Sequence, residues 1–128
     1  SNEINKEANK YAKLNAELNK VKNKIEFLDG DIKKISPRLK NKKILFDYIV
    51  MPRPRLKESF LKEAFMLSKK NTRIFYYDFC LDSEKDKIVE KIKTEAKKVG
   101  KKIKILKVKN AGEIAPYRFR VRVDFIVG

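Results

Sequence analysis

The chain has 128 residues, and its 33 Lys and Arg outnumber its 17 Asp and Glu, which gives a formal net charge of +16. A charge of this size favours a polyanionic partner, usually nucleic acid, although a solvated lysine-rich surface would give the same count. The sequence has no His and one Cys, which excludes histidine catalysis, an internal disulfide and a zinc site. Any chemistry would rely on carboxylates, tyrosines, backbone groups or a cofactor.

The sequence carries no pattern for membrane insertion or secretion. No apolar run approaches the roughly 20 residues that span a bilayer, and no signal-peptide pattern opens the chain. The single cysteine, Cys80, fits a reducing environment. We therefore expect a cytoplasmic protein, and the length suits one domain over residues 1–128.

Helices and strands are predicted to alternate in the first part of the chain. Apolar residues recur at helical spacing over residues 5–22, and residues 25–28 are a predicted short strand before an acidic turn. Residues 32–40 are a weak helical or loop segment that Pro37 breaks. Residues 44–51 are almost continuously apolar, which is typical of a buried parallel strand.

The alternation continues after residue 51. The apolar residues of segment 56–67 predict a helix, and residues 72–80 predict a strand rich in aromatic side chains. A further helix is predicted over residues 83–99, with Ser83 as its N-cap and Gly100 at its C-terminal cap.

The last two predicted strands are residues 102–109 and 117–127, which alternate between apolar and polar side chains. We expect them to pair antiparallel across a loop at residues 110–116. One face of the last strand carries Tyr117, Phe119, Val121, Val123, Phe125 and Val127. The order of elements predicts a three-layer α/β fold with a mostly parallel sheet and a C-terminal antiparallel strand.

Ligands of open α/β sheets bind beyond the carboxyl ends of the strands. At one such end, Asp29 and Asp31 could accept hydrogen bonds from a nucleoside, but Asp caps helices and forms turns about as often. At another, Pro52 and Pro54 remove two N–H donors and could direct neighbouring carbonyls towards a base. For the prolines taken alone, a helix start is the favoured interpretation.

Two tyrosines and three arginines are further candidates for which a structural interpretation competes with a functional one. Tyr76 and Tyr77 are expected to pack in the core and the sheet rather than to catalyse. Arg118, Arg120 and Arg122 share a strand face, either as a phosphate-binding stripe or as a solvated surface.

A nucleotide cofactor normally lies over a Gly-rich loop after the first strand of such a sheet. The four glycines of the chain form no such loop. The first predicted helix begins at residue 5, with no strand in front of it.

Four segments, in order, resemble the catalytic domain of the archaeal and eukaryotic tRNA guanine-N1 methyltransferases. They are EINKEANKYAKLNAELNKVKNKIEFLDGDIKKI, DYIVMPRPRLKESFLKEAF, TRIFYYDFC and AGEIAPYRFRVRVDF. The resemblance implies S-adenosylmethionine as cofactor, a class I methyltransferase sheet of strand order 3-2-1-4-5-7-6, and no metal. It implies tRNA as partner, with methylation of the guanosine just 3′ of the anticodon.

The resemblance also implies roles for individual residues. Glu3 matches the acidic residue that binds the cofactor ribose, and Asp31 and Ile32 match the pair that reads the adenine. Met51 belongs to the cofactor site, at the start of a motif that borders the methyl group and the target base. That motif continues with the catalytic candidates Pro52, Arg53 and Pro54, where relatives often have Asn-Leu-Pro.

The remaining carried-over positions are at the end of the chain. Ala115, Pro116 and Tyr117 match a late Ala-Pro motif that leads into the last strand. The predicted RNA-binding residues are Arg55, Arg118, Arg120 and Arg122.

In the family, the first strand, its Gly-rich loop and the general base precede the point at which this sequence starts. We therefore expect the C-terminal part of a catalytic domain, with Ser1 and Asn2 as a vector remnant, and no methylation by the isolated chain. The strand at residues 44–51 would then present an apolar edge, which predicts dimerisation or strand exchange.

Two other functions stay open. One is the wyosine-pathway transfer of an aminocarboxypropyl group, or methylation of the related tricyclic base. The other is a non-enzymatic, basic RNA-binding α/β module, which the charge of +16 would also suit.

Overall fold

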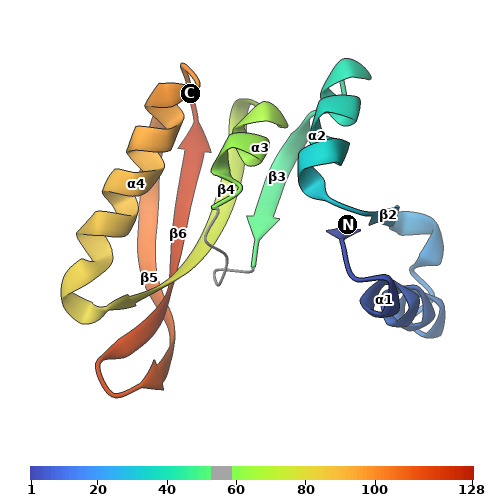
Figure 1. Ribbon diagram of the computed structural model, residues 1–128, viewed down its shortest axis with the longest axis horizontal. Helices are drawn as coiled ribbons and strands as arrows, with labels where there is room; N and C mark the ends of the chain where they lie inside the picture. Colours follow the sequence, from blue (N-terminus) through green and yellow to red (C-terminus); the bar gives the residue numbers. More distant parts are fainter. Residues whose placement is uncertain (53–58) are drawn as a thin grey trace. The chain divides into compact units, whose positions relative to one another are not determined.

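The computed structural model describes residues 1–52 and 59–128, and the chain divides into two compact units (Figure 1). Unit 1 is Ser1–Lys43, and unit 2 is Ile44–Gly128. Three predicted site residues, Arg53, Pro54 and Arg55, lie outside the described residues. The prediction of a single domain stays a prediction.

Unit 1 is built on a pair of short parallel strands. Its elements are β1 (Asn2–Glu3), α1 (Lys6–Leu18), the 3-10 helix η1 (Lys22–Lys24), β2 (Leu28–Asp29) and α2 (Ile32–Asn41). The prediction that no strand precedes the first helix is wrong, because β1 pairs with β2. The strand predicted at residues 25–28 begins only at Leu28, since the two residues of β1 can pair with only two partners.

Helix α2 continues through Pro37, where the sequence predicted a break. Its first turn is fixed by Asp31, which accepts a hydrogen bond from the Lys33 amide, and by the Ser36 hydroxyl, which donates to the Ile32 carbonyl. Beyond the proline, Lys42 N–H donates to the Arg38 carbonyl. The proline removes one donor, and the bonds on both sides of it hold the helix together.

Unit 2 is a mixed four-stranded sheet with two helices. Its elements are β3 (Phe46–Met51), α3 (Leu61–Met66), β4 (Ser68–Leu81), the 3-10 helix η2 (Asp82–Glu84), α4 (Lys85–Lys98), β5 (Ile103–Ala115) and β6 (Arg118–Val127). The strand order is β3-β4-β6-β5, with β3 parallel to β4 and the other pairs antiparallel. This confirms the predicted α/β fold, and the order agrees with the 4-5-7-6 part of the sheet that the resemblance implies.

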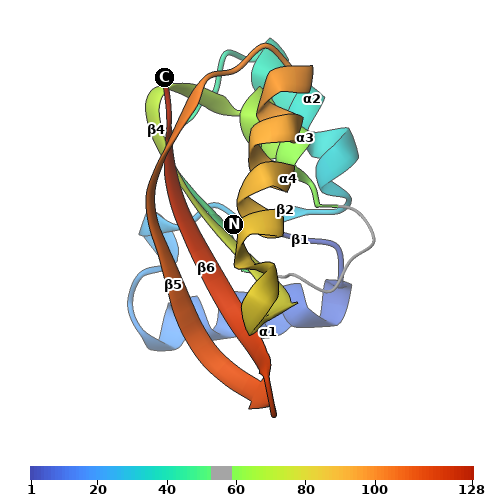
Figure 2. The ribbon, with the colours of Figure 1, turned by 90° about the vertical axis from the view of Figure 1, so that its left-hand side faces the viewer.

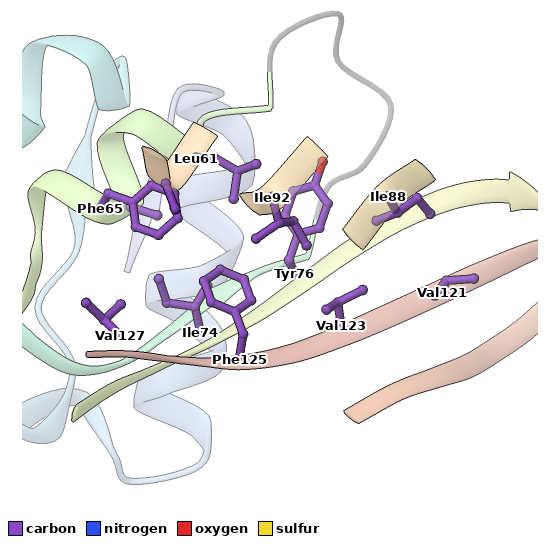
Figure 3. Close-up of a cluster of buried hydrophobic side chains, with 12 residues drawn as sticks. Leu61, Phe65, Ile74, Tyr76, Ile88, Ile92, Val121, Val123, Phe125 and Val127 are labelled. Atoms are coloured by element: carbon purple, nitrogen blue, oxygen red, sulfur yellow. The ribbon is translucent and has the colours of Figure 1, made fainter. Parts of the chain in front are cut away.

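The core of unit 2 lies between its sheet and its two helices. Figure 2 shows α3 and α4 on the same face of the sheet, and Figure 3 shows the side chains packed there. The predicted apolar face of β6 is confirmed for four residues, each at most 1% exposed: Val121, Val123, Phe125 and Val127. Tyr117 does not belong to this face, because it lies in the turn before β6 with φ of 63° and is 78% exposed.

In unit 2, the ends of three elements differ from the prediction. In the described residues, α3 begins at Leu61, and Ser83 lies within η2 instead of capping α4. The loop predicted at residues 110–116 is mostly strand, because β5 stays paired with β6 to Ala115 across irregular steps in the register.

The predicted C-terminal cap of α4 is confirmed. Gly100 has φ of 71°, its N–H donates to Lys97 O, and Lys101 N–H donates to Ala96 O. This pair of bonds closes the helix in a Schellman motif, which requires the left-handed conformation that glycine adopts without strain.

Strand β3 is parallel to β4 as predicted, but it is not buried. It forms one edge of the four-stranded sheet, and Tyr48 and Val50 are 67% and 58% exposed. A strand with a neighbour on one side only leaves backbone groups and apolar side chains accessible. Within unit 2, β3 is therefore an edge strand and not a central one, although its sequence is apolar.

Candidate functional site

The carboxyl ends of β1 and β2 place two predicted cofactor residues at one edge of unit 1. Glu3 ends β1, and Asp31 follows Gly30 just after β2. Gly30 N–H donates a 3.1 Å hydrogen bond to the Glu3 carbonyl, and its φ of 115° turns the chain from β2 into α2. Only glycine adopts this conformation readily, so Gly30 is what lets Asp31 follow the strand so closely.

Glu3 is held by a residue that the sequence did not single out. Its Oε1 accepts a hydrogen bond of 3.0 Å from the Asn5 amide, and its carbonyl accepts one of 2.8 Å from the side chain of Asn9. Asn9 is one of the two buried residues of α1. In a helix rich in Lys and Asn, nothing in the local pattern distinguishes Asn9 from its exposed neighbours.

Asp31 is the N-cap of α2, which is one of the two interpretations that the sequence left open. Its Oδ1 accepts from the Lys33 amide at 3.0 Å, and its carbonyl accepts from the Ile35 amide at 3.1 Å. Ile32 is the first residue of the helix and is half-buried. Asp31 and Ile32 therefore lie at a helix N-terminus, where the helix dipole favours electronegative groups.

In unit 2, the predicted site residues Met51 and Pro52 also lie at the carboxyl end of a strand. Met51 is the last residue of β3 and pairs with Tyr76. The carbonyl of Pro52, the next residue, accepts a 3.1 Å hydrogen bond from Nη2 of Arg120. The structure thus brings together Pro52, predicted as catalytic, and Arg120, predicted to bind RNA.

The predicted arginine stripe on β6 has members in three different situations. Arg118 is exposed. Arg122 forms an ion pair with Asp124, with Nε 2.8 Å from Oδ1. Its Nη2 donates a hydrogen bond to Oδ2 at 3.1 Å, and hydrogen bonding to Asp124 raises the pKa of the guanidinium. Its side chain also lies over the Phe75 ring. Arg120 and Arg122 are therefore engaged within the fold and are not part of a solvated face.

Tyr76 belongs to the core, as predicted. It is 4% exposed, its hydroxyl donates to Asp78 Oδ2 at 2.9 Å, and Lys91 Nζ donates to that hydroxyl at 3.2 Å. Burial, followed by the negative charge of Asp78, raises the pKa of Tyr76. Tyr77 belongs to the opposite face of β4, where its ring lies against the Arg120 guanidinium.

Residues 1–52 and 59–128 lack two kinds of feature. They contain no helix long and apolar enough to cross a membrane. They also contain no group of three His, Cys, Asp or Glu side chains placed to hold a metal ion.

Comparison with known proteins gives a consistent result. The sequence model of the TRM5/TYW2 methyltransferase domain matches residues 1–106. Trm5b from Pyrococcus abyssi is 27% identical with a TM-score of 0.80, and the alignment covers 100% of this chain and 37% of that one. The fold is that of the class I S-adenosylmethionine-dependent methyltransferases.

Two further solved structures share the fold. TYW2 from M. jannaschii, in complex with AdoMet, is 23% identical with a TM-score of 0.81, covering 98% of this chain and 55% of that one. The complex of aTrm5 and tRNALeu gives 22% identity and a TM-score of 0.75, covering 99% and 34%. The chain therefore spans between about a third and a little over half of these proteins.

Proposed function

The chain belongs to the TRM5/TYW2 methyltransferase domain family, and from this membership we propose that it is part of a tRNA guanine-N1 methyltransferase. The proposed reaction is transfer of a methyl group from S-adenosylmethionine to N1 of the guanosine 3′ of the anticodon. The observation that supports the choice is the 27% identity to Trm5b along the whole chain, against 23% to TYW2 from M. jannaschii and 22% to aTrm5 in the tRNALeu complex. The net charge of +16 supports a polyanionic substrate such as tRNA.

The strand-end residues of unit 1 fit a nucleoside cofactor. Carboxylates accept hydrogen bonds and donate none, and a nucleoside presents ribose hydroxyls and an adenine amino group as donors. Glu3 would accept from the ribose, Asp31 from the adenine, and Ile32 would supply apolar contact. When bound, S-adenosylmethionine supplies the electrophilic methyl group.

In unit 2, Pro52 would serve as a wall beside the target base. Its ring fixes φ and removes an N–H, so the wall is stiff and has no donor of its own that could bind the base wrongly. The guanine would have to leave its stack to reach this wall. The work of these residues is positioning, because holding reactants in an attack geometry removes much of the barrier.

The test is a methylation assay with the full natural protein that contains this chain. The protein is incubated with S-adenosylmethionine and a tRNA transcript, and the modified nucleosides are identified by mass spectrometry. We expect 1-methylguanosine, and no product when the guanosine 3′ of the anticodon is replaced by adenosine. An aminocarboxypropyl product would support the wyosine-pathway alternative, and tRNA binding without any modification would support the RNA-binding module.

A further inference from the structure

The side chain of Arg120 is held within unit 2. Its Nη2 donates to the carbonyl of Pro52 at 3.1 Å, and its guanidinium carbon lies 4.6 Å from the centre of the Tyr77 ring. Its Nε is buried and has no hydrogen-bond partner among the described residues. One arginine thus connects two segments that are 68 positions apart in the sequence.

The strand register explains how Arg120 reaches the end of β3. Met51, the last residue of β3, pairs with Tyr76 on β4, whereas Arg120 pairs with Phe79, three residues further along β4. Strands β4 and β6 therefore continue past the point at which β3 ends. The Arg120 side chain crosses β4 over the Tyr77 ring and supplies a donor to Pro52, where the ladder of β3 stops.

The contact acts on the one soft backbone angle of Pro52. The proline ring fixes φ, and the peptide bond is planar, so ψ alone sets the direction of the Pro52 carbonyl. A hydrogen bond to that carbonyl restricts ψ. Arginine suits this role because its planar guanidinium can stack on a ring while its edge donates, whereas a lysine ammonium cannot do both.

We propose that Arg120 is a positioning residue for methyl transfer and not a phosphate ligand. It fixes the Pro52 carbonyl, and with it the wall that borders the target base. This inference rests on the proposed function, which places Pro52 beside the reacting centre. It predicts that loss of Arg120 slows the chemical step, whereas loss of a phosphate ligand weakens tRNA affinity and reduces its salt dependence.

The kinetic test compares Arg120→Gln and Arg120→Lys with Lys102→Gln in the full natural protein. Lys102 is exposed and precedes β5, so its substitution removes one charge without touching Pro52. We expect both Arg120 variants to lower kcat roughly 10- to 100-fold while KM for tRNA changes less than about twofold. We expect Lys102→Gln to leave kcat unchanged. A raised KM with a smaller salt slope and normal kcat, or full recovery of kcat in Arg120→Lys, would overturn the proposal.

A second measurement does not depend on activity. NMR of the guanidinium protons in the chain itself should show slow rotation and slow exchange for Arg120 and fast exchange for the exposed Arg118. Tyr77→Leu, which removes the stacking ring, should accelerate exchange at Arg120. Equal rotation and exchange rates for Arg120 and Arg118 would overturn the proposal even if the enzyme is active. Because this measurement uses the unaltered chain, it tests the proposal even if Arg120→Gln does not fold.

The two experiments separate the two possible failures. If the unaltered protein methylates no tRNA, the proposed function fails whatever the NMR shows. If it methylates tRNA and Arg120 rotates freely, only the positioning role fails.

Discussion

The side-chain amide of Asn9 donates a 2.8 Å hydrogen bond to the carbonyl of Glu3, from a position that is 4% exposed. The same carbonyl accepts the Gly30 amide at 3.1 Å. Glu3 is therefore fixed from α1 on one side and from the turn after β2 on the other. Its own strand has two residues, so the bond from Asn9 adds a fixed point to a short parallel ladder.

Replacing Asn9 by alanine should destabilise the chain. The substitution removes a buried donor to the Glu3 carbonyl, and the expected loss in free energy of unfolding is about 1–2 kcal/mol. Urea unfolding followed by circular dichroism measures it. Asn15→Ala is the matched control, because Asn15 is an exposed residue of the same helix. An equal loss in both variants would show that the contact with Glu3 does not matter.

The role of Asp31 as a helix cap and its proposed role as a cofactor ligand can be tested separately. Asn caps helices about as well as Asp, so Asp31→Asn should change the free energy of unfolding by less than about 0.5 kcal/mol, whereas Asp31→Ala should cost about 1 kcal/mol. Both variants of the full natural protein should bind S-adenosylmethionine about tenfold more weakly or worse, because a charged hydrogen-bond acceptor is lost. Calorimetry measures the affinity, and unchanged binding in Asp31→Asn would leave Asp31 with capping alone.

Local sequence patterns predicted much of unit 2. The alternation along β6 and the cap at Gly100 were predictable because each follows from chemistry within a few residues. The apolar run at residues 44–51 alone predicted a buried strand, because such a run does not show how many neighbours its strand has, whereas the resemblance predicted the apolar edge that β3 presents in unit 2. In unit 1, β1 was not predicted, because two residues are too few to show a strand pattern. The break predicted at Pro37 does not occur, because hydrogen bonds on both sides of the proline compensate for its missing N–H.

The candidate site was predictable only in part. Asp31 and Pro52 were found as polar and proline residues at strand ends, whereas Glu3 came only from the resemblance, and all three lie where strands end. The partners of those residues were not found, because Asn9 and Arg120 are defined by contacts that arise only on folding. Three arginines at alternate positions looked equivalent in the sequence, but each has different neighbours in the structure.

The isolated chain should not bind S-adenosylmethionine. The resemblance implies a Gly-rich loop in the cofactor site, and the four glycines of the chain are too far apart in sequence to form one. Calorimetry of the 128-residue chain should give no measurable heat at micromolar concentrations. Micromolar affinity would contradict this prediction.

The buried hydroxyl of Tyr76 should make stability fall at high pH. Its pKa is raised in the folded chain, mainly by burial, while an unfolded tyrosine titrates at about 10. Above that pH the unfolded chain holds fewer protons than the folded one, so the free energy of unfolding decreases as pH rises. Urea unfolding at pH 8 and at about pH 11 should show a smaller decrease for Tyr76→Phe than for the unaltered chain.

Tyr76→Phe should also lower the free energy of unfolding at neutral pH. Tyr76→Phe removes the hydroxyl from Asp78 and Lys91 and should cost about 1 kcal/mol. Tyr48→Phe is the control, since Tyr48 is 67% exposed and should change neither quantity. If both variants keep the full pH dependence of the unaltered chain, Tyr76 is not its source.

The apolar edge of β3 should make the isolated chain self-associate. An edge strand with exposed Tyr48 and Val50 is a template for pairing with a second copy. Light scattering at high protein concentration should give a mass above that of the monomer. Val50→Lys should return the mass to that of the monomer, because a charge on an edge strand opposes pairing.

The opposite edge of the sheet supplies the control. Leu106 lies on β5, the other edge strand, and is 42% exposed. Leu106→Lys should leave self-association intact if β3 is the strand that pairs. Loss of association in Leu106→Lys but not in Val50→Lys would assign it to β5, and a monomer in the unaltered chain would contradict the prediction altogether.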